Sequence, residues 1–274
     1  MSYVSPFLAK LDISNLSKEE RREALDRHYT QLRKFVKGVC EDKFHLIVNG
    51  DAGMGKTEIT HEVVGKCAKK DCVSISGTIS AVKLFGKFQD ARKPGQVMII
   101  DDTDKVLEDQ ESLEILKGVL DTKKDKIVDW EKYSAALQKS NIKSQFKYEG
   151  RCIIITNKQL RTVPDATPTI QQQRILPVLS RCHYFKAGVP SSQWKIESIR
   201  MHREGYASKH DDYKYELRCF KGVDPKIQTE IIDWLEENAD DIREISFRTC
   251  AMLVELQKQE PVFWKEMAEA SLGC

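Results

Sequence analysis

The sequence predicts an α/β protein with a three-layer core, in which a parallel β-sheet lies between two layers of helices, followed by a small helical domain. Short apolar runs alternate along the chain with segments of helical periodicity, the pattern of parallel strands joined by crossover helices. The runs are almost continuously apolar, which is typical of strands covered on both faces. The predicted strands are Phe44–Val48, Val73–Ile75, Val97–Ile100 and Cys152–Ile155.

Helical segments are predicted before and between these strands. Ser17 and Glu20 have the spacing of a capping box, which predicts the start of a helix that runs to about Cys40. A second helix is expected to end near Lys69, just before the second strand, and a third to cover Glu111–Leu120. This order of elements fits a sheet with crossover connections.

The second half of the chain has a different composition. Two short runs, Ile127–Trp130 and Phe146–Tyr148, predict a hairpin ahead of the fourth strand. After Phe185 the sequence becomes polar and charged, and from Asp224 its pattern is helical. We therefore expect two domains, with residues 1–187 forming the core and its N-terminal helix, and residues 188–274 forming the helical domain.

The composition sets limits on partners and location. The 274 residues are 41% apolar and 31% charged, and 44 basic residues nearly balance 42 acidic ones. This balance neither requires nor excludes nucleic acid, so a basic surface would have to be local. No stretch approaches the roughly 20 apolar residues of a membrane span, and none of the eight cysteines forms a C-x-x-C pair. We expect a cytoplasmic protein with free thiols, without a membrane partner or a zinc site.

A glycine-rich turn follows the first predicted strand and precedes a predicted helix. It matches the phosphate-binding pattern G-x-x-x-x-G-K-[ST] in full, with Gly50, Asp51, Ala52, Gly53, Met54, Gly55, Lys56 and Thr57. Glycines let backbone N–H groups curve around an anion, and the helix adds free N–H donors and the positive end of its dipole. We expect these residues and Glu58 to bind a nucleotide, with Lys56 at the β- and γ-phosphates and Thr57 at Mg²⁺.

Two carboxylates follow the third predicted strand. Asp101 and Asp102 come directly after Ile100. In a parallel sheet the carboxyl ends of the strands share one edge, so both acids are expected near the phosphate loop. Asp101 is the predicted Mg²⁺ ligand, and Asp102 would orient or deprotonate an attacking water. Together with the loop they predict a magnesium-dependent ATP hydrolase.

Three further segments complete a resemblance to the AAA+ family of P-loop ATPases. They follow the loop and the two acids in that family's order, within about residues 20–270: Thr156-Asn157, Ser180-Arg181-Cys182 and Ser246-Phe247-Arg248. The resemblance implies that residues 188–274 form a helical lid. It also implies that Asn157 is sensor 1, with its amide toward the γ-phosphate or the water, and that Arg248 is sensor 2 on the lid. The family usually has Asp-Glu where this chain has Asp101-Asp102, so the second acid is shorter here.

The segment Ser180–Cys182 is similar to a Ser-Arg-Cys segment of clamp-loader subunits, whose arginine enters the nucleotide site of the neighbouring subunit. A guanidinium suits this role because it is planar and always charged. The similarity implies that Arg181 acts in trans within a ring-forming homo-oligomer, of which a hexamer is one arrangement. Arg174 is the alternative finger, and a structural ion pair is the alternative role for either arginine.

The segment from Leu116 to Arg151 more loosely resembles AAA+ proteins of bacteriophages and plasmids. Its hairpin carries a local excess of lysine, which suggests contact with DNA phosphates, with a solvated loop as the alternative. The lysines are Lys123, Lys124, Lys126, Lys132, Lys139, Lys143 and Lys147. We therefore expect a motor or loader that acts in DNA replication, repair or recombination.

Two other functions stay open. One is an ATP-dependent assembly switch or scaffold with little hydrolysis. The other is a protein-remodelling unfoldase that acts on a protein partner. For that function Val82–Gly86 would be the pore loop, unless it is a turn of a buried helix.

Overall fold

The computed structural model describes residues 4–67, 72–123, 125–131, 142–158, 160 and 169–273. Contacts between residues divide the chain into two units. The first contains residues 32–50 and 56–187, and the second contains residues 4–31, 51–55 and 188–273. The expected first domain, residues 1–187, differs from the first unit because the N-terminal segment and the tip of the phosphate loop group with the second unit.

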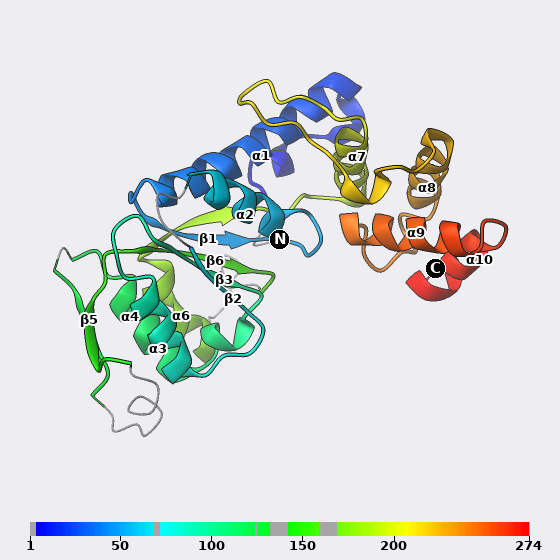
Figure 1. Ribbon diagram of the computed structural model, residues 1–274. Coiled ribbons are helices and arrows are strands. Elements are labelled where there is room, and N and C mark those ends of the chain that lie inside the picture. The colour runs from blue at the N-terminus through cyan, green and yellow to red at the C-terminus, as the bar shows by residue number, and fades with distance from the viewer. Residues whose placement is uncertain are drawn as a thin grey trace. The chain divides into compact units, whose positions relative to one another are not determined.

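A five-stranded parallel sheet forms the centre of the first unit (Figure 1). Its strands lie in the order β2-β3-β6-β1-β7. They are β1 (His45–Asn49), β2 (Val73–Ser76), β3 (Val97–Asp101), β6 (Arg151–Thr156) and β7 (Cys182–Lys186). The first four confirm the predicted strands. The sequence pattern did not indicate β7, because this strand lies at an edge of the sheet and only Phe185 in it is fully buried.

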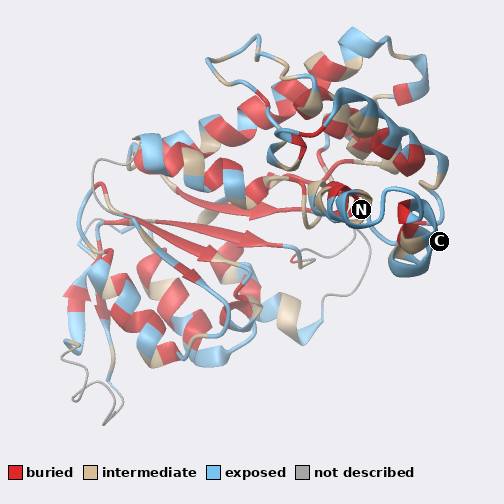
Figure 2. Cartoon of the chain, turned by 45° about the vertical axis from the view of Figure 1, so that its right-hand side comes forward, coloured by how far each residue is buried: buried red, intermediate tan, exposed pale blue. Residues whose placement is uncertain are grey.

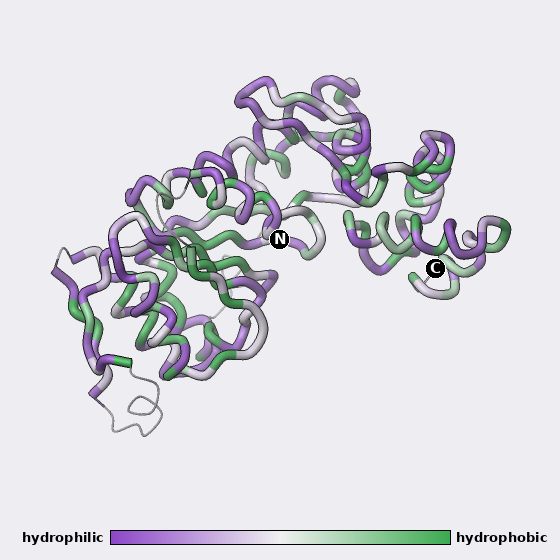
Figure 3. The backbone as a smooth tube through the Cα atoms, in the orientation of Figure 1, coloured by the Kyte–Doolittle hydropathy of each residue, from purple (hydrophilic) through white to green (hydrophobic). Residues whose placement is uncertain are grey.

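Helices cover both faces of the sheet (Figure 1). α2 (Lys56–Cys67) and the C-terminal turns of α1 (Lys18–Cys40) lie on one face. α3 (Ala81–Asp90), α4 (Gln110–Val119) and α6 (Ile170–Leu179) lie on the other face. The central strands between them are buried (Figure 2) and hydrophobic (Figure 3). The predicted three-layer α/β core is therefore confirmed.

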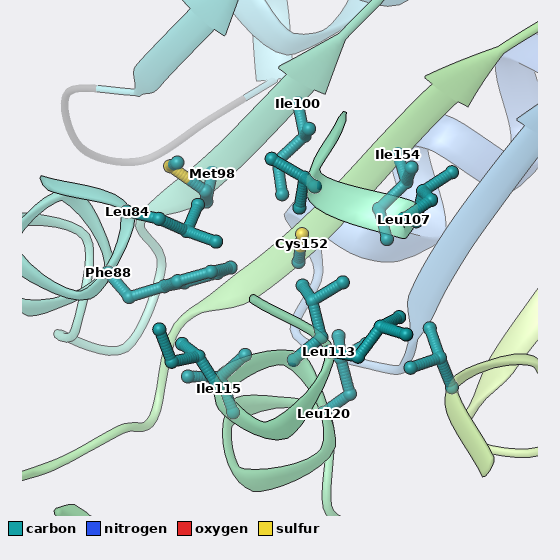
Figure 4. Packing of buried hydrophobic residues seen from close by; sticks show 14 of the residues in the cluster. Leu84, Phe88, Met98, Ile100, Leu107, Leu113, Ile115, Leu120, Cys152 and Ile154 are labelled. Atoms are coloured by element: carbon teal, nitrogen blue, oxygen red, sulfur yellow. The ribbon is translucent and has the colours of Figure 1, made fainter. Parts of the chain in front are cut away.

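The face covered by α3, α4 and α6 holds the main hydrophobic core of the first unit (Figure 4). Leu84 and Phe88 of α3 pack there with Met98 of β3 and Cys152 of β6, and none of the four has exposed surface. Burying a side chain of this size contributes roughly 1.5–3 kcal/mol. The segment Val82–Gly86 thus belongs to a buried helix, so its interpretation as a pore loop is wrong.

The predicted hairpin strands form an antiparallel pair, β4 (Ile127–Asp129) and β5 (Gln145–Lys147). Val128 and Phe146 lie opposite each other and pack into the core, whereas Ile127 is 64% exposed. The pair therefore has one face on the core and one face toward solvent.

Some lysines of the predicted basic segment make local contacts. Three others of that segment, Lys124, Lys132 and Lys139, lie outside the described residues. Lys126 turns inward and donates to two backbone carbonyls at the end of α4, at 2.6 and 2.8 Å, and burial lowers its pKa to about 8. Lys147 pairs with Asp125 and Glu149, each at 3.1 Å. The lysine excess is therefore partly neutralised by local structure.

Four helices form the core of the second unit. They are α7 (Ser192–Arg203), α8 (Pro225–Glu237), α9 (Phe247–Gln259) and α10 (Trp264–Leu272). The last three of these helices confirm the helical pattern predicted from Asp224 onward. Trp234 and Trp264 meet edge to face at 5.9 Å inside this core. Short 3-10 turns lie at η1 (Leu8–Lys10), η2 (Ile13–Asn15), η3 (Asp104–Leu107) and η4 (Arg218–Phe220). No helix among the described residues is long and apolar enough to cross a membrane.

Polar contacts explain why the first half of α1 belongs to the second unit. The helix opens with the predicted capping box. The hydroxyls of Tyr29 and Ser198, on α1 and α7, lie 2.9 Å apart. The hydroxyl of Tyr215 donates to the buried carboxylate of Asp26 at 2.8 Å. The polar stretch after residue 187 thus supplies partners for buried polar groups of α1, as such groups require.

Candidate nucleotide site

The phosphate loop connects β1 to α2, as the sequence predicts. Gly53 and Gly55 have φ angles of 67° and 82°, in the left-handed region that glycine adopts without steric cost. α2 begins at Lys56, so the first N–H groups of that helix follow the loop directly. Glu58 lies exposed in the first turn of α2. A turn and a helix start of this kind present backbone donors to an anion.

Hydrogen bonds to two neighbouring described residues help to hold the side chain of Lys56, which is 6% exposed. Its Nζ donates to the carbonyl oxygen of Gly50 at 2.9 Å and to Oδ1 of Asn157 at 2.8 Å. Asn157 directly follows β6, the strand that lies between β1 and β3. The ammonium group that the motif predicts for phosphates therefore contacts the predicted sensor 1 amide.

Asn157 also contacts the second acid of the strand end. Its Nδ2 donates to Oδ1 of Asp102 at 3.2 Å. Asp102 has a φ of 46°, a left-handed conformation that costs a residue other than glycine roughly 1–3 kcal/mol. Its backbone N–H donates to the carbonyl oxygen of Ile155 at 3.3 Å, which fixes this conformation against β6. Strained residues of this kind cluster at functional sites.

The two predicted Mg²⁺ ligands contact each other. Oγ1 of Thr57 donates to Oδ1 of Asp101 at 3.1 Å. Burial raises the pKa of the Asp101 carboxyl, and the hydrogen bond from Thr57 acts in the opposite direction. The structure thus brings a hydroxyl and a carboxylate together at the carboxyl edge of the sheet, as the sequence predicts.

Asn49 is a site residue that the sequence pattern did not single out. It ends β1 and is fully buried. Its Nδ2 donates to the carbonyl oxygens of Thr156 at 3.0 Å and Lys158 at 2.6 Å, and its Oδ1 accepts from the hydroxyl of Tyr184 at 2.7 Å. Asn49 therefore ties β6 and β7 to β1 immediately before the loop. The available signal was a polar residue at the end of an apolar strand.

The tip of the phosphate loop contacts the start of α9 within the second unit. The carbonyl oxygen of Gly53 accepts a hydrogen bond from the backbone N–H of Phe247 at 3.0 Å. A Cβ atom on Gly53 would lie 2.6 Å from Cβ of Ser246 and 3.7 Å from Cγ of Arg248. The predicted sensor 2 residue therefore lies beside the loop tip, on the helix that the sequence predicts.

Arg181 lies at the amino ends of the strands, whereas the predicted catalytic residues of its own first unit lie at their carboxyl ends. It precedes Cys182, which pairs with His45 at the start of β1, whereas Lys56 follows the other end of β1. The two ends are separated by roughly 15–20 Å along the strand direction. Nη1 of Arg181 donates to the carbonyl oxygen of Pro177 at 2.6 Å, and the side chain lines a cavity of about 890 Å³. The alternative finger, Arg174, is exposed on α6.

The architecture matches solved structures of RuvB from Thermotoga maritima. Two point variants of RuvB align with 88% and 89% of this chain and with 68% of their own length, each at a TM-score of 0.51 and 11% identity. The chain has the AAA+ fold. A further RuvB structure, described as a Holliday junction branch migration motor, aligns with 89% of this chain and 68% of its own at a TM-score of 0.48 and 10% identity.

The chain is also similar in sequence to a phage protein. That relative is an uncharacterized 36.7 kDa protein of Enterobacteria phage T4 from the nrdC-mobD intergenic region. It is 24% identical over 256 residues, which cover 92% of this chain and 75% of the phage protein. No protein-family model matches the chain. The phage relative fits the loose resemblance to phage proteins, while the likeness of Ser180–Cys182 to clamp loaders stays a prediction.

Proposed function

We propose that the chain is an AAA+ ATPase that binds ATP with Mg²⁺ at Gly50–Thr57 and hydrolyses it. The AAA+ fold supports this function. The observation that carries it is the hydrogen-bonded line from Lys56 through Asn157 to Asp102. This line joins a cation for the phosphates, an amide for the γ-phosphate or the water, and an acid for the water.

Each residue of the line would have a separate role. Lys56 would neutralise charge that builds up on the β- and γ-phosphates. Asp102 would accept a hydrogen bond from the attacking water and hold it in line with the γ-phosphorus, and Asn157 would fix the orientation of that carboxylate. Aspartate is one methylene shorter than the glutamate usual in the family, so we expect slow basal turnover.

Thr57 and Asp101 would hold Mg²⁺. The 3.1 Å between Oγ1 of Thr57 and Oδ1 of Asp101 is close to the about 3.0 Å that separates neighbouring ligands in an octahedral Mg²⁺ shell with bonds of about 2.1 Å. When bound, the ion supplies positive charge to the phosphate oxygens. Its presence would favour the ionised form of Asp101, which burial alone disfavours.

Arg181 would complete the site of a neighbouring subunit. Its place at the amino edge of the sheet separates it from Lys56 and Asp101 of the same unit, so a role in hydrolysis requires a second copy of the chain. This supports a ring-forming homo-oligomer. Arg248, beside Gly53, would contact the γ-phosphate as sensor 2.

The central experiment is an ATP-binding titration with matched variants. Lys56→Ala should abolish binding of a fluorescent ATP analogue, because the loop loses its phosphate cation. Asp102→Ala should bind the analogue and lose turnover. Unchanged binding by Lys56→Ala in a folded protein would falsify the proposed site.

We further propose a role in DNA transactions, as a motor or loader. RuvB, which shares the fold, is described as a Holliday junction branch migration motor, and the hairpin region retains lysines such as Lys123 on its exposed side. Turnover should rise on addition of single-stranded or duplex DNA. Stimulation by an unfolded protein instead would favour the remodelling function on a protein partner. Tight ATP binding without turnover under either condition would favour the assembly switch.

A further inference from the structure

An ion pair joins the phosphate loop to α7. The carboxylate of Asp51, the second residue of the loop, lies 3.3 Å from Nζ of Lys195. Both side chains are largely shielded, at 19% and 18% exposure. The ion pair of Lys265 with Glu230 in the same unit is much more open, at 49% and 46% exposure. Because shielded charges are screened less by water and salt, the attraction between Asp51 and Lys195 is weakened less by solvent.

Lys195 lies near the N-terminus of α7, where an acidic partner stabilises a positive charge. Ser191 caps this helix, and the backbone N–H of Lys195 donates to the carbonyl oxygen of Ser191 at 3.1 Å, so Lys195 lies in the first turn. The positive end of the helix dipole disfavours a cation there. Trp194, 1% exposed, anchors the same turn in the unit. Asp51 therefore relieves an unfavourable charge that the fold holds in place.

The carboxylate of Asp51 is unfavourable for phosphate binding unless its charge is neutralised. A loop that receives phosphates gains affinity from positive potential, and a carboxylate on the loop itself repels the incoming anion. An adjacent lysine cancels this repulsion. The loop tip is fixed a second time where Gly53 accepts the hydrogen bond from Phe247.

We propose that Lys195 is a positioning residue for nucleotide binding, which it promotes by neutralising the charge of Asp51 on the loop. The inference rests on the proposed function of the loop. It gives a role to the polar segment after residue 187, to which the sequence assigned none. Lys195 acts through Asp51 and does not itself contact the phosphates.

The test compares four variants by titration with a fluorescent ATP analogue and by steady-state ATPase kinetics. Lys195→Met, which keeps the aliphatic stem, should raise the Kd for nucleotide and the KM about tenfold, a typical coupling between sites, with a much smaller change in kcat. Lys195→Arg should restore most of the affinity. The double variant Asp51→Asn with Lys195→Met should bind more tightly than Lys195→Met alone, because the negative charge at position 51 is gone. Lys265→Ala is the control and should bind like the wild type.

Two results would overturn the inference. One is a Kd for Lys195→Met equal to that of the wild type. The other is a double variant no better than Lys195→Met, since Lys195 would then act on the nucleotide directly. If circular dichroism shows that Lys195→Met does not fold, Asp51→Asn becomes the test. This variant should bind nucleotide at least as tightly as the wild type, and weaker binding would overturn the inference. Failure of the ATPase proposal itself is seen separately, as undiminished binding by Lys56→Ala.

Discussion

The side-chain amide of Asn157 accepts a hydrogen bond from the ammonium group of Lys56 at 2.8 Å. The same amide donates to Asp102, so removing it takes one hydrogen bond from the phosphate cation and one from the acid. We expect Asn157→Ala to lower kcat about 100-fold, as loss of one oriented donor does, and to change the Kd for ATP less than about threefold. Steady-state kinetics and a binding titration measure the two effects. Asn15→Ala, at an exposed asparagine of η2, is the control. Equal losses in binding and turnover would contradict a role confined to hydrolysis.

Because Asp102 has a left-handed backbone conformation, substitutions there should have different effects on stability and on ATP turnover. At a φ of 46° a glycine is unstrained, whereas alanine keeps the strain and loses the hydrogen bond with Asn157. We expect both Asp102→Gly and Asp102→Ala to lose turnover, and Asp102→Gly to be more stable than Asp102→Ala by about 1 kcal/mol. Urea unfolding of the two variants tests this, and identical midpoints would show that the site relaxes without cost.

His45 makes stability depend on pH. Burial lowers its pKa from 6.5 to about 3, and its Nδ1 accepts the backbone N–H of Cys152 at 3.1 Å. Between those values the unfolded chain binds a proton that the folded chain does not. The contribution of His45 to the free energy of unfolding is therefore fully present above pH 6.5. It declines as the pH falls toward 3, by up to about 1.4 kcal/mol per pH unit.

The matched variant is His45→Asn, whose Oδ1 can accept the same hydrogen bond without titrating in this range. Urea unfolding at pH 7, 6, 5 and 4 should give a shallower decline for His45→Asn than for the wild type. Parallel curves would mean that other groups cause the acid sensitivity.

Arg181 supplies a test of assembly. Arg181→Ala should bind ATP normally and lose turnover at least about 1,000-fold if it is a finger. Lys56→Ala should also be inactive, because its own loop cannot bind ATP although its Arg181 is intact. A mixture of the two inactive variants should regain activity, because some interfaces then pair an intact loop with an intact arginine. No regain at any ratio, together with turnover per subunit that is constant on dilution, would rule out action in trans.

Local patterns were enough to name most of the residues that the structure brings together at the candidate site. The glycine and lysine pattern of the loop specifies a turn and a helix start, and parallel strands bring the ends of β1, β3 and β6 to one edge. Asp101 and Asp102 were placed by that rule, Asn157 was named from the resemblance to the AAA+ family, and the contacts of Lys56 and Thr57 agree with both.

Contacts between residues far apart in the sequence could not be predicted from local patterns. α7 was missed because its buried face includes Glu197, Ser198 and His202, which read as surface residues in the sequence. The pair of Asp51 with Lys195 depends on that helix, so no local pattern could indicate it. The strand β7 was missed because an edge strand need not be continuously apolar.

The close approach of Gly53 to Ser246 narrows the choice of residue at one position of the loop. The phosphate-loop pattern leaves this position open to any residue. In this chain a positive φ and a Cβ contact of 2.6 Å both exclude a side chain there. A homologue that carries a larger residue at this position must therefore begin its last-but-one helix differently, so the two sites are expected to change together or not at all.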